Sequence, residues 1–124
     1  MILTHEKSEN DHYISRCTDH EIEINHQVFT QSIIVTPDQI LTDWPPRSAT
    51  ELTTNNIKQL IALKPDVLLI GTGLSLEFPI FSLLSEIMKH HVGYEIMTTS
   101  AACRTFNLLL TEQRRVIAAL MVSL

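Results

Sequence analysis

The sequence predicts a single α/β domain in which an N-terminal antiparallel β meander is followed by a βαβαβ unit with parallel strands. Three features of the chain lead to this prediction. Short stretches within residues 13–43 alternate apolar and polar side chains, which is typical of strands with one face in the core. Residues 67–70 form a continuous apolar run, which is typical of a strand buried on both faces. Apolar residues at helical spacing flank this run on either side.

One domain is enough to account for the length of the chain. Its 124 residues, 44% of them hydrophobic, can build a core of their own. We assign the domain to residues 12–124. Residues 1–11 are polar and aperiodic, so we expect them to be a flexible N-terminus.

The first half of the domain is expected to contain four short strands, over residues 13–17, 21–24, 28–35 and 39–43. Polar turn residues separate the first three strands. The last strand ends before Trp44, because the two prolines that follow have no amide hydrogen to donate to a strand ladder.

The second half alternates helices with strands. Thr53 or Thr54 is expected to cap a helix that carries Ile57, Leu60 and Ile61 on one face. A second helix is expected to start near Pro79 and to end at Gly93. Its core-facing stripe is expected to be Ile80, Leu84, Ile87, Met88 and His91.

The C-terminal elements follow the same pattern. After a strand over residues 94–97, a third helix is expected over about residues 101–113, with Thr98, Thr99 or Ser100 as its cap. Residues 116–122 are either more helix or a strand. Their length and apolar character favour a buried strand, but periodicity alone does not decide.

Charge and hydropathy exclude several classes of function. The formal net charge of −5 has the wrong sign for a nucleic-acid-binding surface. The longest apolar run, residues 116–122, is far shorter than the roughly 20 residues of a membrane-spanning helix, so no membrane insertion is expected. Residues 1–16 carry acids and histidines where a signal peptide needs an apolar stretch, so we expect a cytoplasmic protein. Cys17 and Cys103 are expected to be reduced thiols, and neither a cofactor nor a metal site is expected.

Two loops of the βαβαβ unit are expected to share one edge of the sheet. The carboxyl ends of parallel strands meet at the same edge, where ligands of such sheets tend to bind. Gly71-Thr72-Gly73 follows the first strand, and Thr98-Thr99-Ser100 follows the second. Amide groups at a helix N-terminus, hydroxyls and the guanidinium of Arg104 all favour an anion. The glycine turn lacks the third glycine of a dinucleotide fingerprint, so a nucleotide is not expected.

Three further side chains have alternative interpretations. Cys103, expected in the first turn of its helix beside Arg104, is either a reactive thiol or a packed core residue, and packing is the commoner case. Arg104 either binds a ligand or pairs with Glu95 or Glu112. Trp44 either closes one end of the core or walls a pocket.

A longer motif resembles a known family. The run Glu95-Ile96-Met97-Thr98-Thr99-Ser100-Ala101-Ala102-Cys103-Arg104-Thr105-Phe106-Asn107, with the Gly71-Thr72-Gly73 turn and Phe78-Pro79 before it, is similar to a family of small domains. The family includes the mitochondrial complex I assembly factor 3 proteins, an adipogenesis-associated domain protein and many prokaryotic proteins of unknown function. The resemblance implies a compact three-layer α/β domain with two β-sheets, and makes the segment from Val116 a strand. Ser100 stands where many members have another small residue.

The resemblance implies a role in assembly and supplies no catalytic residue. We therefore expect a non-enzymatic protein-interaction or assembly-factor domain with an unidentified protein partner, and assembly of a respiratory complex is one role open to it. Its contact surface is expected at the edge that carries Gly71, Thr72, Gly73, Thr98, Thr99, Ser100, Cys103, Arg104 and Asn107, with Trp44 as a further member. The alternative is a small-molecule or anion-binding protein, or an undiscovered enzyme, that uses the same edge. A homo-oligomer is also open to the chain, because an edge strand of the meander needs covering.

Overall fold

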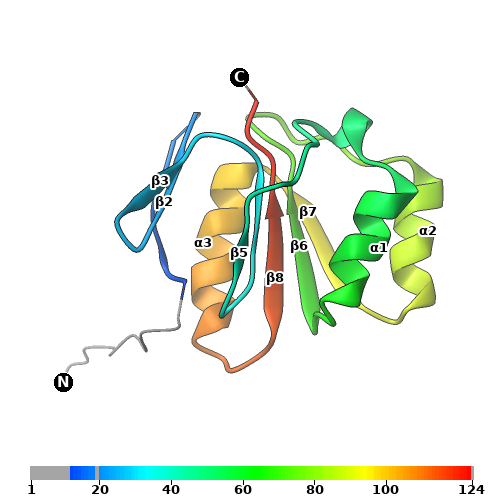
Figure 1. Cartoon of the computed structure of the whole chain (residues 1–124). Helices are drawn as coiled ribbons and strands as arrows, with labels where there is room; N and C mark the ends of the chain where they lie inside the picture. The colour runs from blue at the N-terminus through cyan, green and yellow to red at the C-terminus, as the bar shows by residue number, and fades with distance from the viewer. Residues whose placement is uncertain (1–11, 19, 124) are drawn as a thin grey trace.

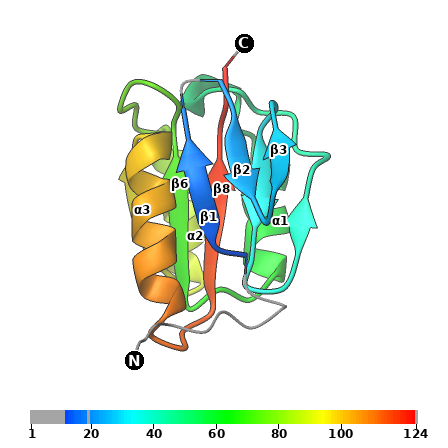
Figure 2. The ribbon, with the colours of Figure 1, turned by 90° about the vertical axis from the view of Figure 1, so that its left-hand side faces the viewer.

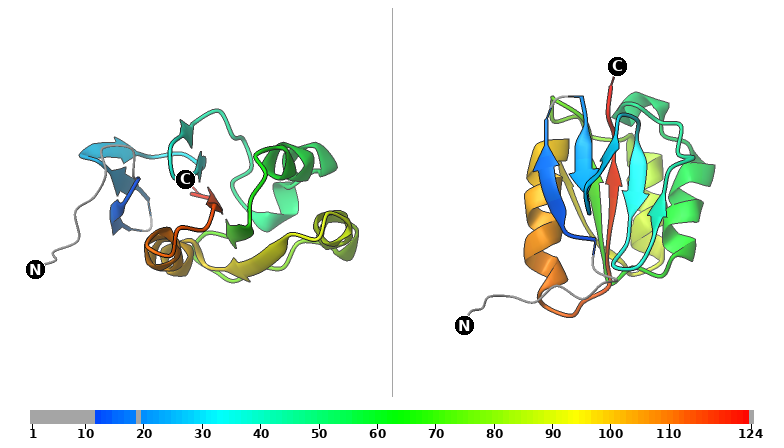
Figure 3. Two further views of the ribbon diagram at one scale, coloured as in Figure 1. Left: turned by 90° about the horizontal axis from the view of Figure 1, so that it is seen from below. Right: turned by 60° about the vertical axis from the view of Figure 1, so that its left-hand side comes forward.

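A computed structural model describes residues 12–18 and 20–123. Over these residues the chain forms three layers: a pair of helices, a five-stranded sheet, and a third helix beside a small three-stranded sheet (Figures 1 and 3). This is the predicted α/β architecture. The expected flexible N-terminus, residues 1–11, lies outside the described residues.

The small sheet is an antiparallel meander of β1 (Ile14–Cys17), β2 (Ile22–Ile24) and β3 (Gln27–Phe29). Asn25 and His26, both with positive φ, make the two-residue turn between β2 and β3. Figure 2 shows the small sheet lying across the face of the larger sheet that also carries the third helix. Its buried side chains face that layer and join its core: Ile14, Ile22, Ile24 and Phe29.

The expected strand over residues 28–35 is wrong as a single element. The chain leaves the small sheet after Phe29 and enters the larger sheet at β4 (Ile33–Val35), which pairs with β5 (Ile40–Leu41). Ser32 lies at this crossing, fully buried, and its Oγ accepts a hydrogen bond from the amide of Val122 at 3.0 Å. Three polar residues, Thr30, Gln31 and Ser32, interrupt the apolar pattern at this crossing, so the sequence did carry a sign of the break.

The larger sheet has the strand order β5-β4-β8-β6-β7. Its strands β6 (Val67–Gly71), β7 (Gly93–Met97) and β8 (Val116–Leu120) are parallel, as the βαβαβ prediction requires. The ambiguous C-terminal segment is therefore a strand, and every residue of β6 and β8 is buried. β4 runs antiparallel to β8 and ties the N-terminal half to the parallel unit.

Helices cover the two faces of the larger sheet. α1 (Thr54–Ala62) and α2 (Phe81–Lys89) pack on one face, and α3 (Thr99–Leu110) packs on the other beside the small sheet (Figure 1). Thr53 is the cap of α1: its Oγ1 accepts from the amide of Asn56, whose side chain accepts from the amide of Thr53 in return. The prediction of a threonine cap at this point is confirmed.

The limits and the buried face of α2 differ from the prediction. The helix begins at Phe81 and ends at Lys89, and His91, with a φ of 58°, makes the left-handed turn that we assigned to Gly93. Leu83 and Ile87 are its buried residues, whereas Ile80 in the expected stripe is 69% exposed. Ile80 precedes the helix as its N-cap residue and His91 follows its end, so neither belongs to the helical face, whereas Leu84 and Ile87 of the expected stripe do pack in the core.

Candidate functional site

The loops after β6 and β7 meet at the carboxyl edge of the sheet, as the sequence predicts. The amide of Thr99 donates to the carbonyl oxygen of Gly73 at 3.0 Å, and the amide of Gly73 donates to Thr99 Oγ1 at 2.8 Å. The amide of Thr72 donates to the carbonyl oxygen of Met97 at 2.8 Å. Two backbone hydrogen bonds and one bond to Thr99 Oγ1 thus hold the two loops together.

The glycines of this turn serve packing and backbone geometry. A Cβ on Gly71 would lie 2.8 Å from Thr99 Cα and 3.2 Å from Ala102 Cβ, so only glycine lets α3 approach β6 this closely. Gly73 has a φ of 95°, a conformation that side chains other than glycine rarely adopt. Both glycines are explained without a ligand.

The threonine hydroxyls of the edge are engaged in internal hydrogen bonds. Thr99 Oγ1 donates to the carbonyl oxygen of Met121 at 2.7 Å while it accepts from Gly73. Thr98 Oγ1 accepts from the amide of Ala101, which makes Thr98 the cap of α3 among the three alternatives. These bonds fix the start of α3 against β6 and β8.

Thr72 holds the loop that leads to α2. Its Oγ1 donates to the carbonyl oxygen of Ser75 at 2.7 Å and accepts from the amide of Glu77 at 3.1 Å. Thr72 itself is 3% exposed. A buried hydroxyl therefore pins two points of this loop to the end of β6.

Cys103 lies in the second turn of α3, not the first, because the helix begins at Thr99 rather than near residue 101. Its side chain is 2% exposed. A hydrogen bond with the thiol of Cys17 and burial both raise the pKa of Cys103 well above its usual range, and the nearby charge of Arg104 offsets this only in part. Of the two alternatives for Cys103, the packed core residue, which the sequence favoured, fits this burial.

Arg104 is exposed on the outer side of α3. Its Nη1 donates to Ser100 Oγ at 3.0 Å, and the ion pairs of the described residues include none between Arg104 and Glu95 or Glu112. A shallow hollow of about 270 Å³ lies between α3 and β1, and it is lined by Tyr13, Ile14, Ser15, Arg16, Cys17, Ser100, Cys103, Arg104 and Asn107.

Asn107 joins α3 to the small sheet. Its Oδ1 accepts from the amide of Ile14 and its Nδ2 donates to the carbonyl oxygen of the same residue, both at 2.8 Å. Ile14 belongs to β1, an outer strand of the small sheet, so the amide side chain satisfies the backbone groups that a further strand would pair. Asn107 therefore holds β1 against α3 through its side-chain amide.

Trp44 lines neither of the hollows that Gly73 and Arg104 border. It is 3% exposed and belongs to the core under α1 and α2, so it closes one end of that core. It also borders a hollow of about 170 Å³ that Asp43 and Arg47 line as well. Within residues 12–18 and 20–123, its buried indole nitrogen has no hydrogen-bond partner.

A stretch of exposed apolar side chains was missed by the sequence interpretation. Between β6 and the first residue of α2, five large side chains are each 52–74% exposed: Leu74, Leu76, Phe78, Ile80 and Phe81. We call residues 74–81 the apolar segment. Met88, 44% exposed, extends the apolar surface along α2. The signal in the sequence was present, since a connecting loop with so many large apolar residues is unusual.

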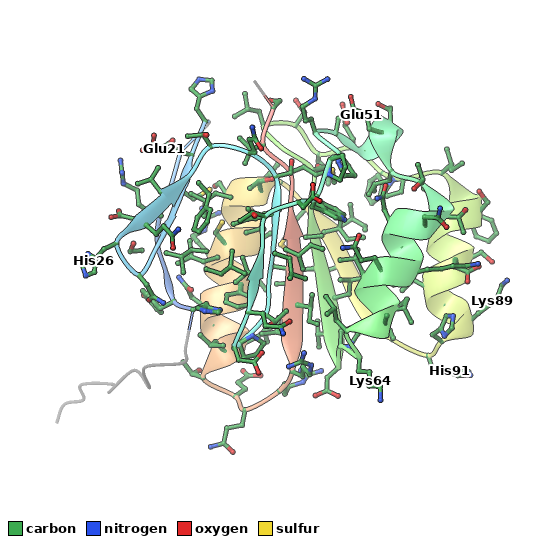
Figure 4. The ribbon with its side chains drawn as sticks, viewed as in Figure 1. Glu21, His26, Glu51, Lys64, Lys89 and His91 are labelled. Carbon is green, nitrogen blue, oxygen red and sulfur yellow. The ribbon has the colours of Figure 1, made fainter. Side chains whose placement is uncertain are left out.

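Basic side chains lie at the ends of α1 and α2 near the amino edge of the sheet. Figure 4 shows Lys64, Lys89 and His91 where α1 and α2 approach the amino edge of the sheet, and Glu51 near the carboxyl edge.

Leu74 lines a hollow of about 190 Å³ together with Gly73, Thr98 and Ser100. The apolar segment therefore adjoins the edge that the sequence singled out.

These features define a class: a three-layer α/β domain whose carboxyl edge is closed by backbone packing and carries an exposed apolar segment. Among the described residues, no three His, Cys, Asp or Glu side chains gather as a metal site would require. The chain belongs to the family described as protein of unknown function (DUF498/DUF598), whose model matches residues 14–121. The resemblance inferred from residues 95–107 is confirmed.

Two relatives and one solved structure show what the chain is similar to. The chain is 34% identical over 88 residues to NADH dehydrogenase [ubiquinone] 1 alpha subcomplex assembly factor 3 of Danio rerio, with 69% of this chain and 50% of the relative covered. It is 32% identical over 62 residues to a 13 kDa major membrane protein of Francisella tularensis, with half of each chain covered. The chain thus spans about half the length of these relatives. A Xanthomonas campestris protein solved by NMR has the same fold, with a TM-score of 0.84, 34% identity, and 98% and 92% of the two chains covered.

One of these relatives is named a membrane protein, so the helices bear on where the chain acts. In the part of the chain that the structure describes, none of the helices has the length and apolar character needed to cross a membrane.

Proposed function

We propose that this chain is a protein-interaction domain that assists the assembly of a protein complex, and that the apolar segment is the centre of its contact surface. The observation that carries the proposal is the exposure of five large apolar side chains within eight residues. Exposed apolar patches of this kind mark interaction surfaces, and aromatic side chains such as Phe78 and Phe81 commonly supply most of the binding energy.

The apolar segment is held in place before any partner arrives. Thr72 fixes the backbone at Ser75 and at Glu77 by hydrogen bonds. At the other end of the segment, Ile80 is the N-cap residue of α2. A loop fixed in this way loses little conformational entropy on binding, which favours affinity. Thr72 thus acts in this proposal as a positioning residue.

The edge residues predicted from the sequence form the polar rim of the proposed surface. Ser100 is exposed and lines the same hollow as Leu74, and Arg104 bonds to Ser100 from the next turn of α3. A polar rim around an apolar centre is the usual arrangement of protein–protein interfaces. Gly71, Gly73 and Thr99 contribute by fixing the backbone under this rim.

The relatives favour a protein partner within a respiratory complex. A relative that matches 69% of this chain is named an assembly factor of NADH dehydrogenase, so we extend the proposal to subunits of such a complex, reached from the cytoplasm. The hollows of about 170, 190 and 270 Å³ are smaller than the roughly 300–1,000 Å³ of typical small-molecule sites, which favours a partner over a ligand.

The test replaces the two aromatic anchors. We expect the double variant Phe78→Ser/Phe81→Ser to lose its partner when the tagged protein is purified from its own host. Native gels of cells that carry this variant should show less of the assembled complex to which the partner belongs. Because both side chains are more than two-thirds exposed, the melting temperature should change by no more than about 2 °C.

Leu108→Ser is the matched control. Leu108 is 64% exposed on α3, outside the apolar segment, so this variant removes a similar apolar surface elsewhere and should keep the partner. Retention of the partner by the double variant, or equal loss in the control, would contradict the proposal. A partner that proves to be a second copy of the chain, seen as a concentration-dependent mass in light scattering, would contradict it as well.

A further inference from the structure

Cys17 and Cys103 come from opposite ends of the domain and meet between the small sheet and α3. Both line the hollow of about 270 Å³ between these elements. Cys17 packs against the core cluster that contains Cys103. They are the two cysteines of the chain.

The two elements that carry the thiols are fixed to each other. Asn107, one helical turn beyond Cys103, bonds to both backbone groups of Ile14 at 2.8 Å, and Ile14 begins the strand that ends at Cys17. The pairing of β1 with β2 and the packing of α3 restrain the two sulfur atoms further. The strand and the helix that carry the two thiols are therefore held against each other in the folded protein.

The two thiols differ in access. Cys103 is 2% exposed, and its hydrogen bond and burial favour the protonated thiol. Cys17 is partly exposed and opens to the hollow. Arg104 and Arg16 line the same hollow, and the charge of Arg16 is offset by Glu21 and Glu23 at 3.0 and 3.3 Å.

We propose that Cys17 and Cys103 are an oxidation site, at which a hydroperoxide converts the thiol pair into an intramolecular disulfide. The Cys17 thiol releases its proton to the solvent and the resulting thiolate attacks one peroxide oxygen. The O–O bond breaks, and the departing oxygen takes up a proton from the solvent to leave as water or an alcohol. The sulfenic acid on Cys17 is then attacked by the Cys103 sulfur. The S–O bond breaks, and the hydroxyl leaves as water with the Cys103 proton. The pair loses two electrons and two protons, which the peroxide receives.

The disulfide has a structural consequence. It ties β1 covalently to α3 and closes a loop that contains most of the domain. A crosslink between distant residues restricts the unfolded chain strongly, so the oxidised form should resist unfolding more than the reduced form. The apolar segment lies outside this contact, so the proposal is independent of the proposed function.

The test uses the full reduced chain and hydrogen peroxide. We expect the loss of two hydrogen atoms in the intact mass, one crosslinked peptide that contains both cysteines, and a rise in melting temperature of about 10 °C that a thiol reductant reverses. Cys103→Ala should not crosslink, and its Cys17 sulfenic acid should be trapped by dimedone. Cys17→Ser should react with hydrogen peroxide and be labelled by dimedone much more slowly than Cys103→Ala, because its remaining thiol, Cys103, is buried.

Three results would overturn the proposal. One is that the wild-type thiols survive peroxide concentrations that oxidise free cysteine. Another is that Cys17 advances to the sulfinic acid without a crosslink, and the third is that the crosslink forms between two chains, as a non-reducing gel would show.

Discussion

The close approach of α3 to β6 can be tested by one added methyl group at Gly71. A Cβ there would lie 2.8 Å from the backbone Cα of Thr99 and 3.0 Å from its Oγ1. Gly71 cannot move away, because it pairs with Met97 on one side and Leu120 on the other, and its carbonyl oxygen accepts from Met121. Overpacking a rigid site costs about 1–3 kcal/mol, and contact with backbone atoms puts Gly71→Ala at the upper end.

The entropy of the unfolded chain offsets part of this cost. Replacing glycine by alanine stabilises a compatible site by about 0.4–1 kcal/mol, so the net loss for Gly71→Ala should be about 2 kcal/mol. For a domain of this length, 1 kcal/mol corresponds to about 4 °C in melting temperature, so calorimetry should record a fall of about 8 °C.

Gly93→Ala is the matched control for Gly71→Ala. Gly93 also lies in a strand of the sheet, but an added Cβ would meet only the carbonyl oxygen of Asp66 at 3.7 Å, an ordinary contact. This variant should melt at or slightly above the temperature of the unmodified protein. If Gly71→Ala melts within about 2 °C of Gly93→Ala, the argument that packing requires a glycine in the Gly-Thr-Gly turn is refuted.

Two further predictions concern polar side chains at which the sequence suggested a binding surface. Thr99→Val leaves a backbone donor and a backbone acceptor without their partner in a buried site, and should cost about 3 kcal/mol in urea unfolding, whereas Thr99→Ser should recover most of this loss. Asn107→Ala removes both hydrogen bonds to Ile14 and should cost about 1–3 kcal/mol. Hydrogen exchange should show the amide of Ile14 losing protection, and protection that stays unchanged would contradict the role of Asn107 in holding β1.

The local elements of the fold followed from the sequence. The apolar runs at residues 67–70 and from Val116 predicted strands, and the threonine before the first apolar stripe predicted the cap of α1. Two strand–helix–strand connections predicted that the loops after β6 and β7 would share an edge, and hydrogen bonds between Gly73 and Thr99 bear this out. These inferences succeeded because each depends on neighbours along the chain or on the fixed handedness of such connections.

Contacts between distant segments were not predicted. Ser32, at the break between β3 and β4, accepts from the amide of Val122 near the other end of the chain. The alternatives for Cys103 were weighed from its neighbours along the chain, whereas Cys17, which lines the same hollow, comes from the other end of the domain. A local pattern does not carry such pairings.

The sequence by itself therefore determined the order of the elements, the buried parallel strands and the edge where the two loops meet. Only the tertiary structure decided that the hydroxyls of this edge are occupied, that Cys17 and Cys103 are neighbours, and that the apolar segment stays exposed. The physical reason lies in the range of the interactions. Periodicity, capping and turn geometry act over a few residues, whereas burial is settled by which distant surfaces remain to cover a side chain. The described residues leave most of Phe78 and Phe81 exposed.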